Sequence, residues 1–230
     1  MGSRRTSRKI NRPSCPLCCV IGGLVLIGSA LPACSAESHW VRHVIHEGEQ
    51  AMTAVAGDFS GDGLPDVISD SGGMTRLFVA PDWQEVVLYE HPEFKWYIHS
   101  EFFDVDNDGD LDYIAARYDP GQVVWLEQPA HALAERWQTH LIDETIHGIH
   151  GLMKGDIGND GQWELFATSA QPKEPYPESL VWFAVPENPR QAGRWKLNVF
   201  ADRDAPGLTH YIGVGDINGD GLVGGHRHGF

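Results

Sequence analysis

Short apolar and alternating runs, separated by clusters of Gly, Asp, Asn and Pro, make up most of the chain after residue 40. Runs such as residues 67–68, 113–115 and 165–167 are typical of short strands that end at turns. No segment keeps apolar residues at helical spacing between capping residues, so we expect very little helix. The pattern therefore predicts an all-β protein.

One polar motif occurs four times, and each copy follows small or apolar residues. The copies begin at Asp58, Asp104, Asp156 and Asp216, which are 46, 52 and 60 residues apart. Strand-like runs follow the first three copies. Each copy is therefore expected to be a loop between two strands, and the regular spacing indicates a repeat architecture.

Two more features recur in the repeats: an apolar run that ends in proline, and then a tryptophan that opens an alternating strand. These tryptophans are Trp83, Trp137 and Trp195. A unit of about fifty residues with four short strands matches one blade of a β-propeller. Residues 40–45 have the same form as residues 137–142 but precede the first loop, which predicts that an N-terminal strand completes the last blade.

The four motifs resemble the Asp-x-Asp-x-Asp-Gly-x-x-Asp loop of FG-GAP/VCBS-type (integrin-alpha-like) propeller repeats. The matching segments are Asp58–Asp66, Asp104–Asp112, Asp156–Glu164 and Asp216–Gly224. The resemblance covers residues 40–224 and implies four-stranded blades with a calcium loop between the first and second strands. It predicts about three complete blades and the start of a fourth within residues 37–230.

The fourth repeat is short, because only residues 222–230 follow its Asp-Gly turn. Residues 224–230 do not have the alternating pattern that follows the other loops. We expect a full ring to contain about six to eight blades. The sequence therefore predicts that the missing C-terminal blades belong to a longer version of this chain and would be its natural partners.

Calcium prefers six to eight oxygen ligands at about 2.3–2.6 Å, and a glycine lets a loop turn sharply while alternate residues point inward. Four carboxylates gathered without a cation would repel one another strongly. The expected ligands are the side chains of Asp58, Ser60, Asp62 and Asp66 with the Leu64 carbonyl, and those of Asp104, Asp106, Asp108 and Asp112 with the Asp110 carbonyl. The first two loops are thus predicted to hold structural Ca²⁺.

The third and fourth loops are poorer versions of the motif. The third keeps Asp156, Asp160 and Glu164 but has Gly158 where a ligand is expected. The fourth keeps Asp216, Asn218 and Asp220 but has Gly224 at the ninth position. We therefore expect two complete calcium sites, one weakened site and one defective site.

The EF-hand is the obvious rival interpretation of the loops, but this chain does not fit it. An EF-hand needs flanking helices and a glutamate at the twelfth position, where this chain has Ser69, Ala115, Ala167 or Arg227. Alternatively, the Asp-Gly and Asn-Gly clusters are turn formers of hairpins and bind no ion.

Residues 1–36 have the layout of a secretory signal peptide, with five basic residues before an apolar run at residues 18–31. Residues 31–34, Leu-Pro-Ala-Cys, resemble a lipobox, which predicts lipidation of Cys34. Ordinary cleavage nearby, for example after Ala36, would instead give a freely secreted protein. We expect an exported protein at the outer surface or in the periplasm, anchored through Cys34 or otherwise secreted.

The charge and the cysteine content narrow the range of possible functions. Lys and Arg total 17 against 32 Asp and Glu, a net charge of -15, which argues against nucleic-acid binding because phosphate neutralisation needs a basic face. All four cysteines fall in or beside the leader, so no disulfide is expected in the exported domain. The prediction is an extracellular recognition scaffold for a protein or carbohydrate ligand, which meets the membrane only through its leader or lipid anchor.

Three histidines give the alternative function. His99, His150 and His210 each lie five or six residues before a loop motif, near the start of the innermost strand. There they could bind a catalytic metal, act as a general base or contact a sugar. The pattern loosely resembles aldos-2-ulose dehydratases, which implies a sugar-converting enzyme of the lyase or dehydratase type. The sequence favours the other interpretation, a purely structural role in which each histidine completes a hydrogen bond between blades.

The tryptophans divide into two groups. Five recur at equivalent positions of the blades, which favours packing between sheets over a carbohydrate platform. Trp96 and Trp163 lie off that pattern, and Trp96 is the better candidate for stacking on a ligand.

Overall fold

The computed structural model describes residues 42–91, 93, 97–204, 209–216, 218–220 and 223–229. The predicted leader at residues 1–36, with Cys34, lies outside these residues, as do Trp40 and Trp96. Nearly all the described residues belong to one compact unit, 43–230. Among them there is no helix long and apolar enough to cross a membrane.

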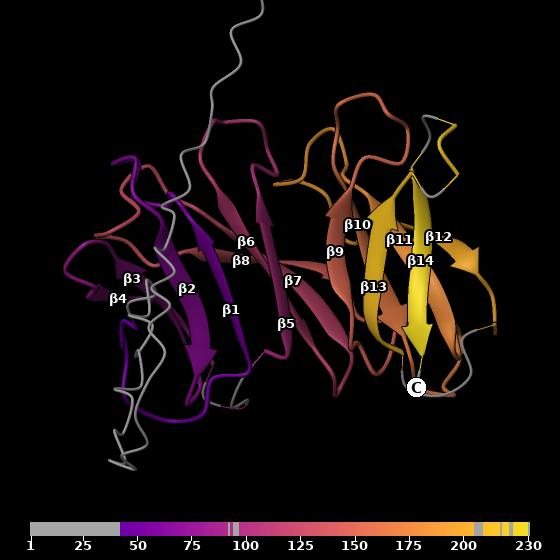
Figure 1. Ribbon diagram of the computed structural model, residues 1–230, viewed down its shortest axis with the longest axis horizontal. Coiled ribbons are helices and arrows are strands. Elements are labelled where there is room, and N and C mark those ends of the chain that lie inside the picture. The colour runs from indigo at the N-terminus through magenta and orange to yellow at the C-terminus, as the bar shows by residue number, and fades with distance from the viewer. Residues whose placement is uncertain are drawn as a thin grey trace, which may run out of the picture. The chain divides into compact units, whose positions relative to one another are not determined.

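The described part of the chain is built from antiparallel strands (Figure 1). The first sheet has the order β1 (Thr53–Gly57), β2 (Asp66–Ser71), β3 (Met74–Val79) and β4 (Gln84–Glu90). The second has the order β5 (His99–Phe103), β6 (Asp112–Arg117), β7 (Gln122–Glu127) and β8 (Gln138–Asp143). The third has β9 (Leu152–Gly155), β10 (Glu164–Ser169), β11 (Ser179–Ala184) and β12 (Lys196–Ala201), and β13 (Thr209–Gly215) pairs with β14 (Gly224–Gly229).

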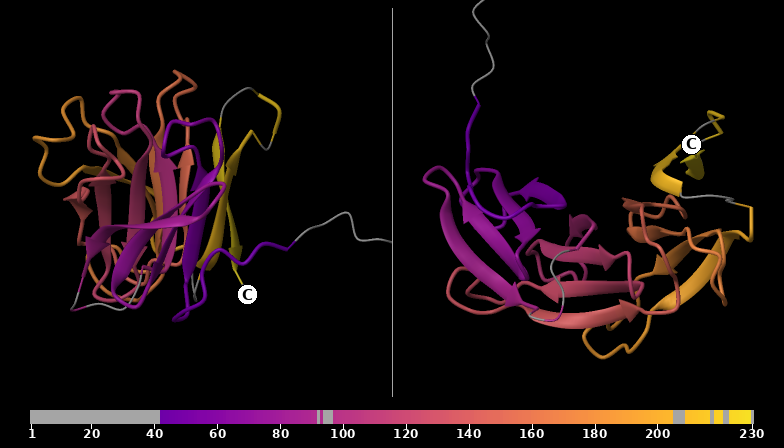
Figure 2. Two further views of the ribbon diagram at one scale, coloured as in Figure 1. Left: turned by 90° about the vertical axis from the view of Figure 1, so that its left-hand side faces the viewer. Right: turned by 90° about the horizontal axis from the view of Figure 1, so that it is seen from below.

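The sheets follow one another along an open arc within this unit (Figure 2). Their first strands are neighbours, because β1 contacts β5, β5 contacts β9 and β9 contacts β13. A hydrogen bond of 2.6 Å joins the Thr53 and Ser100 hydroxyls across the first of these junctions. The prediction of an all-β propeller with three complete blades and the start of a fourth is confirmed.

Two details of the sequence prediction were wrong. Residues 224–229 do form a strand, paired with β13 in a register that runs from Gly215↔Gly224 to Thr209↔Gly229. Antiparallel pairing uses backbone groups, so it needs no alternation of side chains. The described residues 42–52 form no strand. A strand needs a hydrogen-bonding partner, and this segment instead brings the His46 ring 5.2 Å from the ring of Phe78.

The core lies between the blades, and the middle strands show why. Tyr113 and Ala115 of β6 pack in the cluster shared with the first blade, together with Phe59 and Leu77. Ile114 and Ala116 pack in the cluster shared with the third blade. Successive side chains of a strand point to opposite faces, so a sheet covered on both faces needs an unbroken apolar run. The run at residues 113–116 is therefore the sequence signature of a sheet between two others.

The tryptophans that open the outer strands join one blade to the next. Trp137, 2% exposed, precedes β8 and donates its backbone N–H to the Leu88 carbonyl at 3.0 Å. Trp195 precedes β12 and makes the same bond to Ile142 at 3.0 Å. For Trp137 and Trp195 the predicted role in packing between sheets is confirmed.

Candidate metal centres

The four polar motifs lie at equivalent places, on the loops β1–β2, β5–β6, β9–β10 and β13–β14. Their fourth and sixth residues have left-handed backbone angles, which glycine adopts freely and asparagine tolerates. The fourth residues are Gly61 (φ 75°), Asn107 (φ 60°), Asn159 (φ 51°) and Gly219 (φ 76°), and the described sixth residues are Gly63 (φ 86°), Gly109 (φ 99°) and Gly161 (φ 84°). The repeated Gly and Asn positions of the motif are thus required by the turn itself.

The first aspartate of the first three loops folds its loop in one common way. Its carboxylate accepts the backbone N–H groups of the fifth and sixth residues at 2.8–3.1 Å. The fifth residue then accepts the N–H of the seventh at 2.8–3.1 Å. These bonds are local, because the donor and the acceptor of each lie within the same nine residues.

The ninth residue braces the loop against the sheet. In the second loop Asp112 accepts the N–H of Val105 at 2.9 Å and that of Gln128 at 2.8 Å. Burial raises the pKa of Asp112 to about 7, and these two hydrogen bonds oppose the shift. Asp66 accepts the N–H of Ser60 at 2.8 Å and that of Ala80 at 2.9 Å. The role of these carboxylates as metal ligands stays a prediction.

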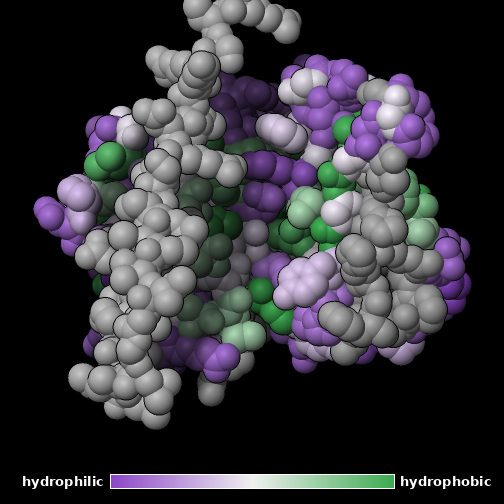
Figure 3. All heavy atoms as spheres, in the orientation of Figure 1, coloured by the Kyte–Doolittle hydropathy of each residue, from purple (hydrophilic) through white to green (hydrophobic). Residues whose placement is uncertain are grey.

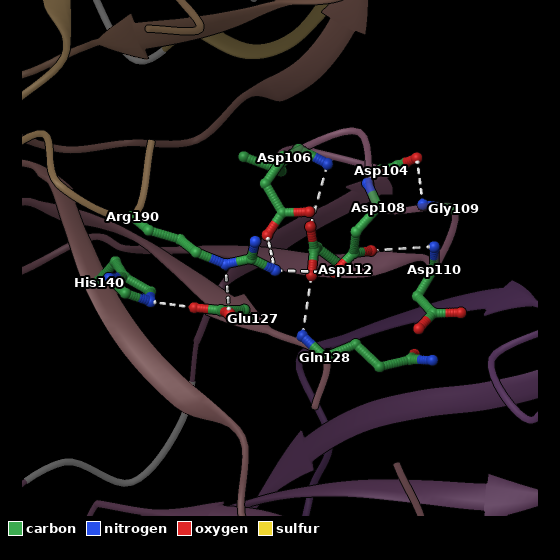
Figure 4. Close-up of polar contacts among 11 residues, drawn as sticks. Asp104, Asp106, Asp108, Gly109, Asp110, Asp112, Glu127, Gln128, His140 and Arg190 are labelled. Atoms are coloured by element: carbon green, nitrogen blue, oxygen red, sulfur yellow. Dashed lines mark hydrogen bonds and ion pairs between the residues drawn. The ribbon is translucent and has the colours of Figure 1, made fainter. Parts of the chain in front are cut away.

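The second loop gathers three carboxylates (Figure 4). Asp104, Asp106 and Asp108 each offer an oxygen within 4.8 Å of the others, and among the described residues no other three acidic, histidine or cysteine side chains do so. The side chain of Asp106 is only 3% exposed. Burial, followed by the charge of Asp108, raises the pKa of Asp106. The arrangement is electrostatically costly and calls for a cation.

One cation is supplied by the next blade. Arg190, on the loop between β11 and β12, places Nη2 2.5 Å from Asp106 Oδ2 and 2.7 Å from Asp108 Oδ2. Its Nε donates to Glu127 Oε1 at 2.7 Å, and Glu127 Oε2 lies 2.7 Å from the ring of His140. Neither oxygen of Asp106 completes a hydrogen bond of normal geometry with the described residues, so Arg190 leaves this carboxylate only partly compensated.

The other loops are looser. In the first, Ser60 Oγ is buried and makes no hydrogen bond with the described residues, whereas Leu64 is exposed. In the third, Glu164 accepts the N–H of Ile157 at 2.7 Å. In the fourth, the side-chain amide of Asn218 donates a hydrogen bond to Asp220 Oδ2 at 2.8 Å, so this carboxylate oxygen of the motif already has a partner. Among the described residues, the acidic side chains of the first and third loops are not gathered as those of the second loop are.

The other ends of the innermost strands bring three histidines together. His99 opens β5, His150 lies just before β9, and His210 lies in β13. The ring of His150 lies 6.3 Å from that of His99 and 4.3 Å from that of His210, measured between centroids. Burial, and then the neighbouring His150 and His210, lower the pKa of His99 to about 4. Burial and His210 lower the pKa of His150 as well.

Residues 104–167 match the family of FG-GAP-like repeats. The chain contains an FG-GAP-like repeat. No curated protein matches the chain. The matched repeat begins at the first aspartate of the second loop, includes the third loop and His150, and ends in β10. FG-GAP repeats are typical of extracellular or exported proteins, and the repeat supports a propeller-type interaction domain.

Sequence reasoning missed two parts of these centres. Arg190 lies 82 residues from Asp108 and outside the matched FG-GAP repeat, in a polar turn with no distinctive pattern. The ring of Tyr118, which directly follows β6, lies 4.6 Å from that of His150. Both contacts join different segments of the chain, so no local signal could have revealed them.

Proposed function

We propose that this chain is an exported, calcium-binding FG-GAP propeller that serves as an extracellular recognition scaffold. The observation that carries the proposal is the group formed by Asp104, Asp106 and Asp108, whose oxygens lie within 4.8 Å of one another. Such hard oxygen ligands on a tight loop suit Ca²⁺. The ion would neutralise the loop and tie β5 to β6, so its role is structural.

A surface for the ligand lies beside this loop. Asp104 and Asn107 line a cavity of about 170 Å³ together with Trp163. Trp163 is 45% exposed, and Lys154 Nζ lies 5.7 Å from its ring. Exposed tryptophan next to polar groups is a common means of holding a sugar ring or a protein side chain. In the view of Figure 3, hydrophilic residues gather at the upper right, over the loop that follows β9.

Calcium titration of the full chain tests the proposal. We expect heat of binding in calorimetry and a rise in the melting temperature, because a ligand that binds only the folded state stabilises it by about 2.7 kcal/mol at one hundred times its dissociation constant. Asp106→Asn together with Asp108→Asn should abolish calcium binding by the second loop. Glu135→Gln, at an exposed carboxylate outside the four loops, is the matched control and should leave calcium binding intact. A cooperative melt without any response to calcium would leave the loops as simple turns and overturn the proposal.

The alternative of a sugar-converting enzyme stays a prediction. The observation in its favour is that the rings of His99, His150 and His210 lie next to one another. Turnover of a sugar that is lost in His150→Gln, while calcium binding is retained, would support it.

A further inference from the structure

We infer that a cavity between the first two blades takes up a lysine side chain of an extracellular partner protein. This cavity, here called the Gln128 cavity, is lined by the first loop, the second loop and the connection between β7 and β8. Its wall includes Asp110, Gln128, Ala130, Ala132, Leu133 and Ala134. The inference rests on the proposed role of the chain as a recognition scaffold and names the chemistry of the partner.

Gln128 provides a buried acceptor that the described part of the chain does not use. The residue is 8% exposed, and its Oε1 makes no hydrogen bond with the described residues. Its backbone is fixed, because its N–H donates to Asp112 at 2.8 Å. A buried carbonyl oxygen without a partner is costly, so a donor that enters the cavity is favoured. The last torsion of a glutamine side chain has broad minima, so the amide turns its oxygen toward the cavity at little cost.

The charge of the lining favours a cation. Asp110 is exposed, and none of the described lining residues is Lys or Arg. The side chains of Asp110 and Gln128 extend to the side of the second loop that lies away from Arg190 (Figure 4). Arg190 forms its ion pairs with Asp106, Asp108 and Glu127 instead. The predicted calcium ligand of Asp110 is its backbone carbonyl, so its carboxylate is left for another partner.

The apolar part of the wall suits the stem of a lysine. The connection between β7 and β8 supplies Leu133 and three alanines, and the Trp137 indole N–H holds it by donating to the Ala132 carbonyl at 3.2 Å. Lysine buries its methylene groups along apolar surface and keeps its ammonium group with polar partners. Its five side-chain heavy atoms need roughly 150 Å³, at roughly 30 Å³ for each. The cavity has a volume of about 320 Å³, so it has room for the whole side chain.

The two acceptors distinguish lysine from other ligands. An ammonium group has three donors and no acceptor, so it serves the amide oxygen of Gln128 and the carboxylate of Asp110 together. The planar guanidinium of arginine is better suited to a single carboxylate that it binds through two hydrogen bonds. A carboxylate or phosphate ligand would be repelled by Asp110 and by the net charge of -15.

Titration of the full chain with the peptide acetyl-Gly-Lys-Gly-amide, followed by NMR of the ¹⁵N-labelled protein, tests the inference. Saturating Ca²⁺ is present, so that the acidic loops are occupied before the peptide is added. We expect saturable shifts of the Gln128 side-chain amide and of the Asp110 backbone amide. The same peptide with an Nε-acetylated lysine is the matched probe and should cause no shifts, because acetylation removes the charge. Equal shifts with both peptides would overturn the inference.

Two variants test the acceptors. Gln128→Met keeps the unbranched shape and should weaken peptide binding at least ~10-fold, since a hydrogen bond to a charged group is worth about that much affinity. Asp110→Asn should weaken it up to about five-fold, because the carboxylate is exposed. Gln84→Met and Asp82→Asn, at exposed residues outside the cavity, are the matched controls and should leave binding unchanged. Unchanged affinity in Gln128→Met would count against the site.

Thermal denaturation gives a readout that does not depend on a ligand. Gln128→Met should not lower the melting temperature, because it replaces a buried oxygen that has no hydrogen-bond partner among the described residues. A lower melting temperature would show that the amide serves the fold, which contradicts its assignment as an acceptor for a ligand.

The calcium and lysine proposals fail separately. A protein that responds to Ca²⁺ but not to the lysine peptide would overturn this inference alone, whereas peptide binding without any calcium response would overturn the calcium proposal alone. Titration with the free diamine cadaverine separates the two sources of an ammonium group. Weaker binding of cadaverine than of the peptide would support a partner protein, and tighter binding would assign the cavity to free amines and overturn the inference.

Discussion

One end of the innermost strands carries the acidic loops and the other end carries the histidine cluster. The two ends also differ in how they are assembled. At one end each polar loop folds on itself, as Asp104 shows by accepting the N–H groups of Asp108 and Gly109 at 3.1 and 3.0 Å. At the other end His99, His150 and His210 come from three different blades. The loop is thus a local structure, whereas the histidine cluster exists only when the blades are packed. Disturbing the packing between blades should therefore affect the histidine end more than the loop end.

The largest effect is expected from Trp137→Ala. Trp137 is 2% exposed between the first and second blades, and removal of a buried tryptophan costs about 3–5 kcal/mol through lost burial and the cavity left behind. Urea denaturation should show this loss in the free energy of unfolding. Trp163→Ala, at a tryptophan that is 45% exposed, is the matched control and should cost much less. Equal losses in the two variants would contradict the view that the blades are held together by the tryptophans of the outer strands.

The next effect compares two glycines, one at each end. Gly109 in the second loop has φ 99° and open space where a side chain would lie, whereas Gly121 beside the histidine end has φ 91° and a Cβ there would collide with the Ile146 carbonyl. Left-handed strain costs about 1–2 kcal/mol in either place, and overpacking adds about 1–3 kcal/mol only at Gly121.

Thermal and urea denaturation of Gly121→Ala and Gly109→Ala should therefore rank the first as the less stable protein. If Gly109→Ala were the more destabilised variant, the loop end would be the more tightly packed one and the comparison would be reversed.

The same contrast explains what the sequence could predict. The loop motif, the four-strand unit and the tryptophans of the outer strands are each encoded within a short segment, and all three were recognised correctly. The run of apolar residues at 113–116 likewise follows from a sheet buried on both faces. These features depend on neighbours in sequence or on the period of a strand.

The remaining features depend on where separate segments meet. The sequence put the three histidines at equivalent positions but left the convergence of their rings open, because that depends on how β5, β9 and β13 pack. It gave no sign of Arg190, which reaches the second loop from another blade. Pairing of β14 was missed because backbone hydrogen bonds tolerate a polar segment without alternation.

The smallest effect concerns Arg190, which contacts the second loop although it lies far from that loop in the sequence. Its guanidinium lies against Asp106 and Asp108, so it stabilises the metal-free loop and competes with a bound ion for the same oxygens. A partly exposed ion pair is worth up to about 1 kcal/mol, which corresponds to roughly a five-fold change in affinity. In calorimetry Arg190→Gln should therefore bind Ca²⁺ about five-fold more tightly than the wild type, and Arg194→Gln, at an exposed arginine paired with Glu144, should not change it. Weaker binding by Arg190→Gln would mean that the arginine holds the carboxylates in place for the ion, and the loop end would then depend on blade packing as the histidine end does.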